Sequence, residues 1–218
     1  MLNQVILRNA GWTIKKGDNM NENQLILNLA AGKLLPLDLK KNCFVIQLDT
    51  MFYAYDTPDI IEKRAYHWIE EPFTDQMRHC KENAFQFMEN TTIPFDRICA
   101  YRFLEHVTFT QVEYFIYLIS TCLEIGGQAD IIVPDYNKLA KLLLEDNTQD
   151  PEFHSKNITL TTELLNEPSC PHASIWTKDR LHYFFCEVEK RFKMINMKDN
   201  FEFDGRDLYI RGQFERIK

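Results

Sequence analysis

Long apolar runs are missing from this sequence. Across its 218 residues, no stretch approaches the roughly 18 consecutive apolar residues that a transmembrane helix needs. The opening residues, MLNQVILRNAGWTIKK, also lack the order of charged, apolar and small residues that marks a signal peptide. We therefore expect a soluble protein in the cytoplasm, with no membrane partner.

Positive charge is in short supply as well. Lysine and arginine together number 25 against 32 aspartates and glutamates, and the formal net charge is -7. A broad nucleic-acid surface needs many cationic groups to neutralise phosphates, so this composition argues against one. A local basic patch stays compatible with it.

Cysteine pairs with metal or redox spacing are absent. No CxxC motif occurs among the six scattered cysteines, Cys43, Cys80, Cys99, Cys122, Cys170 and Cys186. Free cysteine behaves as a small buried hydrophobe, so we interpret them as reduced packing residues. His154, His172 and Cys170 are too loosely spaced to indicate a ligand set, and no metal is expected.

Internal repeats, low-complexity segments and linkers rich in proline, glycine or serine are absent too. Hydrophobic residues make up 45% of the chain, which is enough to bury one good core. Nothing in the composition divides the chain. Residues 1–218 are therefore predicted to form a single domain.

Four short apolar runs predict the strands of a parallel sheet. They are continuous rather than alternating in hydrophobicity, as expected of strands buried on both faces. Helical segments separate them, which indicates an α/β fold. The runs are Gln24–Leu29, Cys43–Leu48, Phe95–Tyr101 and Gln128–Pro134.

Two further segments have helical spacing. Apolar residues between positions 109 and 123 recur at intervals of three and four, and Gly126 and Gly127 are interpreted as the stop signal of that helix. Thr177 is the expected N-cap of a second helix. Its apolar face consists of Leu181, Phe184, Phe185 and Val188.

The last part of the chain holds two β-rich runs joined through FDGRD. These runs are Arg191–Met197 and Asp207–Glu215. Two such runs separated by a short turn favour an antiparallel hairpin. We expect them to be the last two strands of a seven-stranded sheet.

Four sequence motifs carry a resemblance to a known family. They are LILNLAAG, VIQLD, FDRICAYRFLEHV and LEIGGQADIIVPD, in this order. From roughly Gln24 to its C-terminus the chain resembles the class I S-adenosylmethionine-dependent methyltransferases, in particular the type 11 methyltransferase-like group. The resemblance implies a Rossmann-like seven-stranded sheet with a C-terminal antiparallel hairpin and helices on both faces. It also implies methyl transfer from S-adenosyl-L-methionine to an oxygen or nitrogen of an acceptor that the sequence does not identify.

The resemblance also implies a cofactor site. In open parallel sheets, ligands bind beyond the carboxyl ends of the strands. Asp49 follows the second strand, where an acid can accept hydrogen bonds from ribose hydroxyls. Asn83 matches the position beside the adenine, although it could equally cap a helix over AFQFMEN. The implied contacts are Asn28, Ala30, Gly32, Asp49, Thr50, Asn83, Ala84 and Tyr101.

The AAG loop departs from the family pattern. Gly32 permits close backbone approach to a ligand, but Ala30 stands where the family usually has glycine. The loop is then either a cofactor loop or a tight strand-to-helix turn. The second case would make the chain a non-catalytic interaction or assembly protein. A dinucleotide-dependent oxidoreductase is disfavoured, because the spaced glycines of a pyrophosphate loop are absent.

Two residues are candidates for catalysis. The aromatic face of Tyr101, or that of Phe52, could hold the sulfonium cation. His106 could act as a general base, since histidine titrates near neutral pH, or it could be a structural residue at a helix start. Methyl transfer depends mainly on alignment and desolvation, so the lack of a catalytic dyad is uninformative.

Two long segments lie between the predicted elements. Residues 50–76 are rich in aromatic and charged residues and are interpreted as a substrate lid, with a short helix around Ile60–His67. Asp146–Trp176 is a second irregular stretch that we expect to cover the same cleft from the other side.

Overall fold

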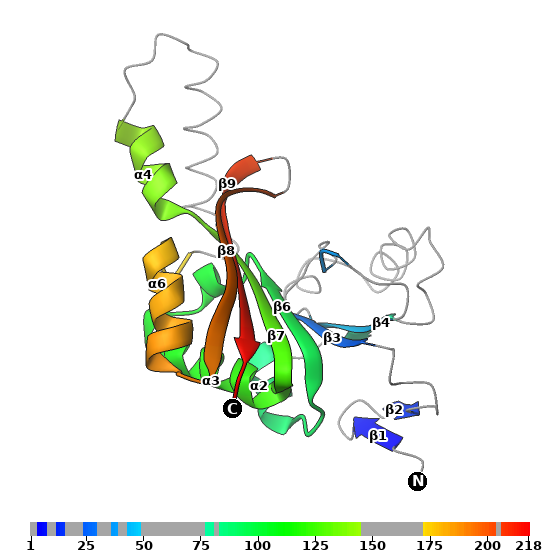
Figure 1. Cartoon of the computed structure of the whole chain (residues 1–218). Helices are drawn as coiled ribbons and strands as arrows, with labels where there is room; N and C mark the ends of the chain where they lie inside the picture. The colour runs from blue at the N-terminus through cyan, green and yellow to red at the C-terminus, as the bar shows by residue number, and fades with distance from the viewer. Residues whose placement is uncertain are drawn as a thin grey trace, which may run out of the picture.

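The computed structural model describes residues 4–7, 12–15, 24–29, 36–38, 43–48, 77–80, 83–144, 172–203 and 206–218. Within them, a seven-stranded sheet has the order β5-β4-β3-β6-β7-β9-β8. A separate two-stranded hairpin pairs β1 (Gln4–Leu7) with β2 (Trp12–Lys15). Figure 1 shows this hairpin beside the main sheet, near the N-terminus.

Three strands of the main sheet have the bounds of predicted apolar runs, whereas the strand predicted at Gln128–Pro134 begins earlier, at Leu123, and the strand Met77–Cys80 was not among the predicted runs. β3 to β7 pair in parallel, and β9 runs antiparallel to both of its neighbours. The predicted seven-stranded α/β sheet is therefore confirmed. Its strands are β3 (Gln24–Leu29), β4 (Cys43–Leu48), β5 (Met77–Cys80), β6 (Phe95–Tyr101), β7 (Leu123–Pro134), β8 (Phe192–Phe203) and β9 (Arg206–Arg216).

The closing hairpin is confirmed and is longer than predicted. β8 continues past Met197 to Phe203, and most of its residues are exposed. β8 lies at one end of the strand order. Its register with β9 shifts at three places, and Asn200 within it has a positive φ of 50°. The hairpin is thus irregular along its outer strand.

Two of the described helices begin at N-cap residues. Asn83 caps α2 (Ala84–Asn90). Thr177 caps α6 (Lys178–His182), where its Oγ1 atom accepts a hydrogen bond from the Arg180 amide at 3.2 Å, as predicted. α6 continues into the π-helical turn η6 (Tyr183–Val188). The remaining helices are η4 (Leu104–His106), η5 (Phe109–Gln111), α3 (Val112–Cys122) and α4 (Tyr136–Leu144).

The predicted glycine stop is wrong. α3 ends at Cys122, and Leu123 is already extended and paired with Phe95 in the sheet. Gly126 and Gly127 lie inside β7, where the register with β6 shifts. Gly126 has a φ of 85°, and a Cβ on Gly127 would meet three carbonyl oxygens at 2.9 to 3.2 Å. Both glycines therefore permit the irregular backbone of β7 at this point.

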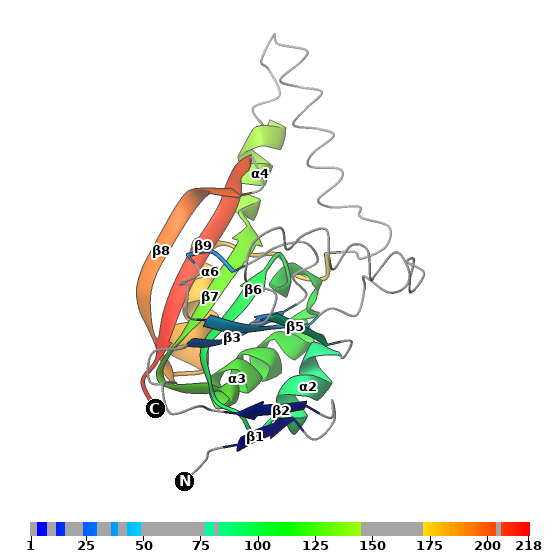
Figure 2. The same ribbon diagram turned by 90° about the vertical axis from the view of Figure 1, so that its right-hand side faces the viewer.

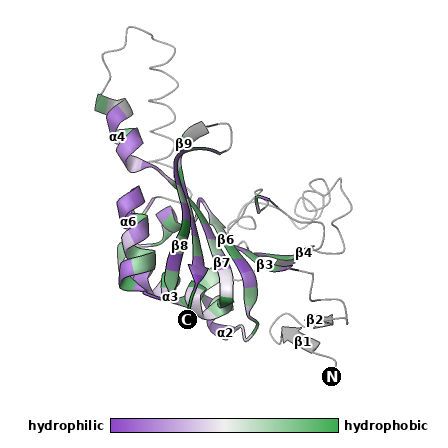
Figure 3. Cartoon of the chain, viewed as in Figure 1, coloured by the Kyte–Doolittle hydropathy of each residue, from purple (hydrophilic) through white to green (hydrophobic). Residues whose placement is uncertain are grey.

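Helices α2, α3 and α6 pack on one face of the sheet (Figure 2). Their core includes Phe87, Phe115 and Phe185 together with apolar residues from the central strands. A second, smaller core lies on the other face and includes Leu139 of α4. α4 extends beyond the end of β7 (Figure 3) and ends at Leu144, which is exposed. Helices on both faces were predicted, but the segments after β3 and β4 lie largely outside the described residues.

Other expectations can be compared with the described part of the chain. Its helices include none with the length and apolar character needed to cross a membrane. Cys43, Cys99 and Cys122 are free and buried, and Cys186 is free and half-buried, as predicted for packing residues. The predicted lid at residues 50–76, with its helix at Ile60–His67, lies outside the described residues. Of the second irregular stretch, only residues 172–176 are described.

Candidate functional site

The order of the sheet creates a switch point between β3 and β6. From β3 the chain moves to β4 and β5 on one side, and it then returns to place β6 on the other side of β3. In open α/β sheets, ligands bind beyond the carboxyl ends of the strands at such a reversal. The ends of β3 and β6, at Leu29 and Tyr101, therefore border the candidate site.

Asn28 lies on β3 just before this edge. Its side chain is fully buried, and its Nδ2 atom donates a hydrogen bond to Oε1 of Gln47 on β4 at 2.6 Å. The two residues are register partners in the parallel pair. Asn28 thus links the two strands that carry the expected cofactor loops. Ala30, Gly32, Asp49 and Thr50, which are on those loops, lie outside the described residues.

Asn83 is the N-cap of α2. Its Oδ1 atom accepts hydrogen bonds from the backbone amides of Phe85 at 2.9 Å and of Gln86 at 3.4 Å. The capping interpretation is confirmed. Ala84 is buried in the core beneath the helix. A contact of either residue with an adenine stays a prediction.

Tyr101 is the last residue of β6 and is completely buried. β6 thus ends where the predicted run Phe95–Tyr101 ends. The Tyr101 hydroxyl donates to Asp130 Oδ2 at 2.8 Å and accepts from the Leu37 amide at 3.1 Å. Burial raises the pKa of this hydroxyl above its usual range, so it stays protonated. Its ring packs edge-on against Phe203.

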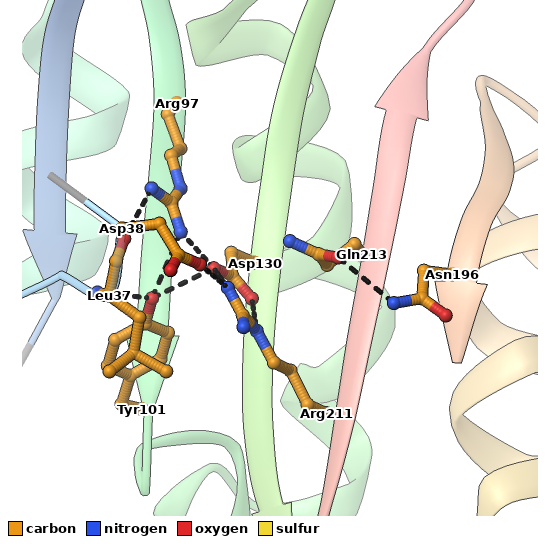
Figure 4. A network of polar contacts seen from close by, with 8 residues as sticks. All are labelled: Leu37, Asp38, Arg97, Tyr101, Asp130, Asn196, Arg211 and Gln213. Carbon is orange, nitrogen blue, oxygen red and sulfur yellow. Dashed lines mark hydrogen bonds and ion pairs between the residues drawn. The ribbon is translucent and has the colours of Figure 1, made fainter. Parts of the chain in front are cut away.

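The Tyr101 hydroxyl belongs to a buried charged network centred on Asp130 of β7 (Figure 4). Arg211 of β9 donates from Nε to Asp130 Oδ1 at 2.9 Å and from Nη2 to Oδ2 at 2.8 Å. Arg97 of β6 forms a second ion pair with Asp130 and donates to the Leu37 carbonyl at 2.7 Å. Two guanidinium groups therefore share one carboxylate.

The electrostatics of this network favour the ionised carboxylate. Burial alone would raise the pKa of Asp130, but the hydrogen bonds and charges of Arg211 and Arg97 outweigh it and hold the pKa below its ordinary value. Arg211 also reaches Asp38 Oδ2 at 3.0 Å. Sequence reasoning missed this network, although Arg97 in FDRICAY and Asp130 in QADIIVP were charged residues inside predicted buried strands.

A second polar cluster follows the carboxyl ends of β6 and β7. Its main-chain frame is η4, which begins three residues after β6. The Glu105 carbonyl accepts hydrogen bonds from the amides of Ala173 at 2.6 Å and Ser174 at 3.0 Å. Ser174 Oγ donates to the Leu104 carbonyl at 2.8 Å and accepts from Trp176 Nε1 at 2.9 Å. The segment at residues 172–176 is thereby fixed against η4.

This frame brings together the side chains of Glu105, His106 and His172, which we call the Glu105–His106–His172 cluster. One donor atom from each lies within 4.8 Å of the others. The two imidazole rings meet edge to face, with centroids 4.9 Å apart. Glu105 is fully buried, while both histidines are half-buried.

Tyr136 of α4 completes the surroundings of His172. Its hydroxyl lies 2.6 Å from His172 Nδ1. Burial, together with electrostatic interactions with His106 and Arg102, lowers the pKa of His172 to about 4. Burial and the nearby Glu105 raise the pKa of Tyr136 to about 12. At neutral pH the cluster therefore presents a neutral imidazole and a protonated phenol.

Sequence reasoning found one member of this cluster, His106. Glu105 lay within the FDRICAYRFLEHV motif with no role assigned to it, and His172 was considered together with Cys170 and His154. His172 is far from Glu105 in the sequence, and hydrogen bonds between the segment at residues 172–176 and η4 bring the two together.

Neither a protein-family profile nor a curated protein matches this sequence. Solved structures do match it. The Burkholderia thailandensis 1,6-didemethyltoxoflavin-N1-methyltransferase, with bound 1,6-didemethyltoxoflavin and S-adenosylhomocysteine, has a TM-score of 0.57 at 13% identity over 91% of this chain and 73% of its own. The N-methyltransferase NodS from Bradyrhizobium japonicum WM9, in complex with S-adenosylhomocysteine, has a TM-score of 0.52 at 12% identity over 89% of this chain and 79% of its own.

The chain has the class I methyltransferase fold. A third structure of this fold extends beyond the present chain. The O-methyltransferase family 2 protein from Planctomyces limnophilus, in complex with apigenin, has a TM-score of 0.59 at 12% identity. It covers 92% of this chain, which spans only 53% of that protein.

Proposed function

We propose that this protein binds S-adenosyl-L-methionine and transfers its methyl group to an oxygen or nitrogen of an acceptor. The observation that carries the proposal is the switch point between β3 and β6, which lies where the motifs LILNLAAG and FDRICAY end. Two solved structures with this fold hold S-adenosylhomocysteine, the demethylated product of that cofactor.

The cofactor side of the proposed site is formed by the loops after β3 and β4. Ala30 and Gly32 would approach the cofactor through their backbone, and Asp49 with Thr50 would lie at the ribose. The Asn28–Gln47 hydrogen bond supports this arrangement, because it holds the ends of the two strands together. Asn83 and Ala84 at the start of α2 are the proposed adenine contacts.

The acceptor side is proposed to lie after β6. His106 is the candidate group that contacts the acceptor, because it follows this strand closely and belongs to a half-buried polar cluster. Only the ring of Tyr101 is proposed to interact with the sulfonium cation, because its hydroxyl is hydrogen-bonded to Asp130 and Leu37. In-line methyl transfer needs alignment more than acid–base help, so a single polar cluster is sufficient.

Calorimetry with S-adenosylhomocysteine tests the proposal. A charge-assisted hydrogen bond contributes roughly 1.5 to 3 kcal/mol, and about 1.4 kcal/mol corresponds to a factor of ten in affinity. Asp49→Ala should therefore weaken binding at least about tenfold, and Asp49→Asn should weaken it less. The matched control is Asp199→Ala on β8, an exposed acid in a weak ion pair, which should bind as the parent does.

A second candidate function is favoured by Ala30 in the AAG loop. If its methyl group blocks the backbone approach, the chain is a non-catalytic interaction or assembly protein. Ala30→Gly separates the two cases, because restored glycine should tighten cofactor binding where the loop is merely crowded. Absence of binding heat at millimolar cofactor in both the parent and Ala30→Gly would reject the methyltransferase proposal.

A further inference from the structure

We propose that Glu105, His106 and His172 bind one divalent transition-metal ion. Ion binding does not require the cofactor, and only the role of the ion toward the acceptor rests on the proposed function. Each residue offers one donor atom, and the three atoms lie within 4.8 Å of one another. In the described part of the chain, this group gathers ligand types from η4 and from the segment before α6.

The donor set has the chemistry of a transition-metal site. Two imidazole nitrogens and one carboxylate oxygen suit Zn²⁺ and related first-row ions. Ligands bound at about 2.0 to 2.2 Å in tetrahedral geometry lie about 3.4 Å from one another. The donor atoms therefore need to approach by at most about 1.5 Å, which rotation of the side chains can provide.

The backbone holds the ligands in place before any ion binds. The Glu105 carbonyl accepts two amide hydrogen bonds, from Ala173 and Ser174, and so fixes the residue before them, His172, beside η4. Glu105 and His106 are consecutive residues of η4 itself. All three ligands therefore belong to one hydrogen-bonded unit, and little chain entropy opposes their assembly around an ion.

The hydrogen bonding of His172 is that expected of a metal-binding histidine. Its Nδ1 atom lies 2.6 Å from the Tyr136 hydroxyl, and its Nε2 atom is buried with no hydrogen-bond partner among the described residues. A metal-bound histidine characteristically engages one ring nitrogen in such a bond and ligates with the other. A cation at the center of the cluster would give Nε2 the partner that the described residues do not.

The charges around the cluster indicate that ion affinity depends on the three ligands themselves. Glu105 is the one acid of the set, and Arg102 lies close enough to His172 to act on it electrostatically. A positive neighbour opposes binding of a cation. Affinity must then come from coordination by the three side chains, so loss of any one of them should have a large effect.

Three protein ligands leave a coordination position open for water or for an oxygen of another molecule. If the proposed function is correct, the acceptor oxygen is the group that would occupy it. This would assign His106 to holding the ion rather than to accepting a proton. The proposal thereby favours an oxygen acceptor capable of metal coordination.

The test is titration of the full chain with Co²⁺ followed by visible absorption, and with Zn²⁺ followed by calorimetry, both without cofactor. The parent should bind one ion per chain and show the absorption bands of protein-bound Co²⁺. His172→Gln should weaken binding at least about tenfold, and Tyr136→Phe about ten- to a hundredfold through loss of the hydrogen bond to Nδ1. Tyr136→Phe keeps the ring, so it remains informative if His172→Gln does not fold.

The matched control is His182→Gln on α6, where the side chain is 42% exposed and outside the cluster. It should bind the ions as the parent does. Equal affinities of the parent, His172→Gln and Tyr136→Phe would overturn the proposal, as would the absence of ion binding by the parent. Cofactor calorimetry separates the two proposals: a parent that binds S-adenosylhomocysteine but no ion rejects only the metal site, and the converse result rejects only the methyltransferase site.

Discussion

The two faces of the main sheet are built from the same strands but are buried in different ways. Ile98 and Ala100 of β6 point into the core under α2, α3 and α6, which consists of apolar side chains. The alternate residues Arg97 and Tyr101 point to the other face and enter the network around Asp130. The period of two along β6 thus sends Arg97 and Tyr101 to the face opposite the helices, where the charged network lies beside the smaller core; we call this the polar face.

The two faces should differ in how well they tolerate substitutions. Apolar contacts are non-directional, so the helix-covered face can lose or shift one contact and keep the others. On the opposite face each charge depends on particular partners, because an ion left alone in the interior keeps its desolvation cost. Single substitutions on the polar face should therefore be the more damaging ones.

The largest effect is expected from Asp130→Ala. This change leaves Arg97 and Arg211 together in a largely buried site without their shared carboxylate. We expect the free energy of unfolding to fall by about 3 to 5 kcal/mol, as for other broken buried pairs. Urea unfolding measures it. Lys178→Ala, which removes an exposed ion pair with Asp199, is the control and should cost less than about 1 kcal/mol. Equal losses in the two variants would break the comparison.

A smaller effect of the Asp130 carboxylate is expected on the stability of the protein at acidic pH. The pKa of Asp130 is lowered in the folded protein from its ordinary value of 3.8. A lowered pKa stabilises the folded state above the ordinary value, and this contribution is lost as the pH falls below 3.8 toward the folded value. Unfolding measured from pH 6 to pH 2, about the range that brackets this value, should show a steeper decline in the parent than in Asp130→Asn. Parallel curves would contradict the assigned role of the carboxylate.

The smallest effect is expected on the apolar face, at Gly212 of β9. A Cβ atom there would meet Phe214 Cε2 at 2.8 Å and Leu181 Cδ2 at 2.9 Å. Both contacts are to side chains of the core, so Gly212→Ala should cost about 1 to 3 kcal/mol, the usual range for overpacking. Urea unfolding again measures it, with Gln213→Ala on the opposite face of β9 as the control. A loss larger than that of Asp130→Ala would reverse the ranking of the two faces.

Local patterns in the sequence were enough to predict most of the fold. The continuous runs of β3, β4 and β6 match their observed bounds, and Thr177 and Asn83 cap helices because a cap depends on the next three residues alone. Gly126 and Gly127 led to the wrong prediction of a helix stop, because a helix stop and an irregular strand both require the backbone freedom of glycine.

The polar clusters could not be predicted, because their members meet only through tertiary structure. Arg97, Asp130 and Arg211 come from three strands, and their pairing depends on the position of β9 beside β7. His172 reaches Glu105 through main-chain hydrogen bonds that have no sequence signature. Arg97 and Asp130 lie inside predicted buried strands, but the sequence does not identify their partners.

The irregular outer strand β8 has a consequence for the behaviour of the protein at high concentration. A long regular strand at the rim of a sheet offers a continuous row of amides and carbonyls to which another chain can add, and such addition leads to aggregates. The three register shifts of β8 and the left-handed Asn200 interrupt that row. Charged side chains are also exposed along β8, namely Lys193, Lys198, Asp199 and Glu202, and charge on an edge strand discourages pairing. The rim is thereby a poor template for adding strands from further chains, although Met194 and Ile195 leave apolar surface exposed on it.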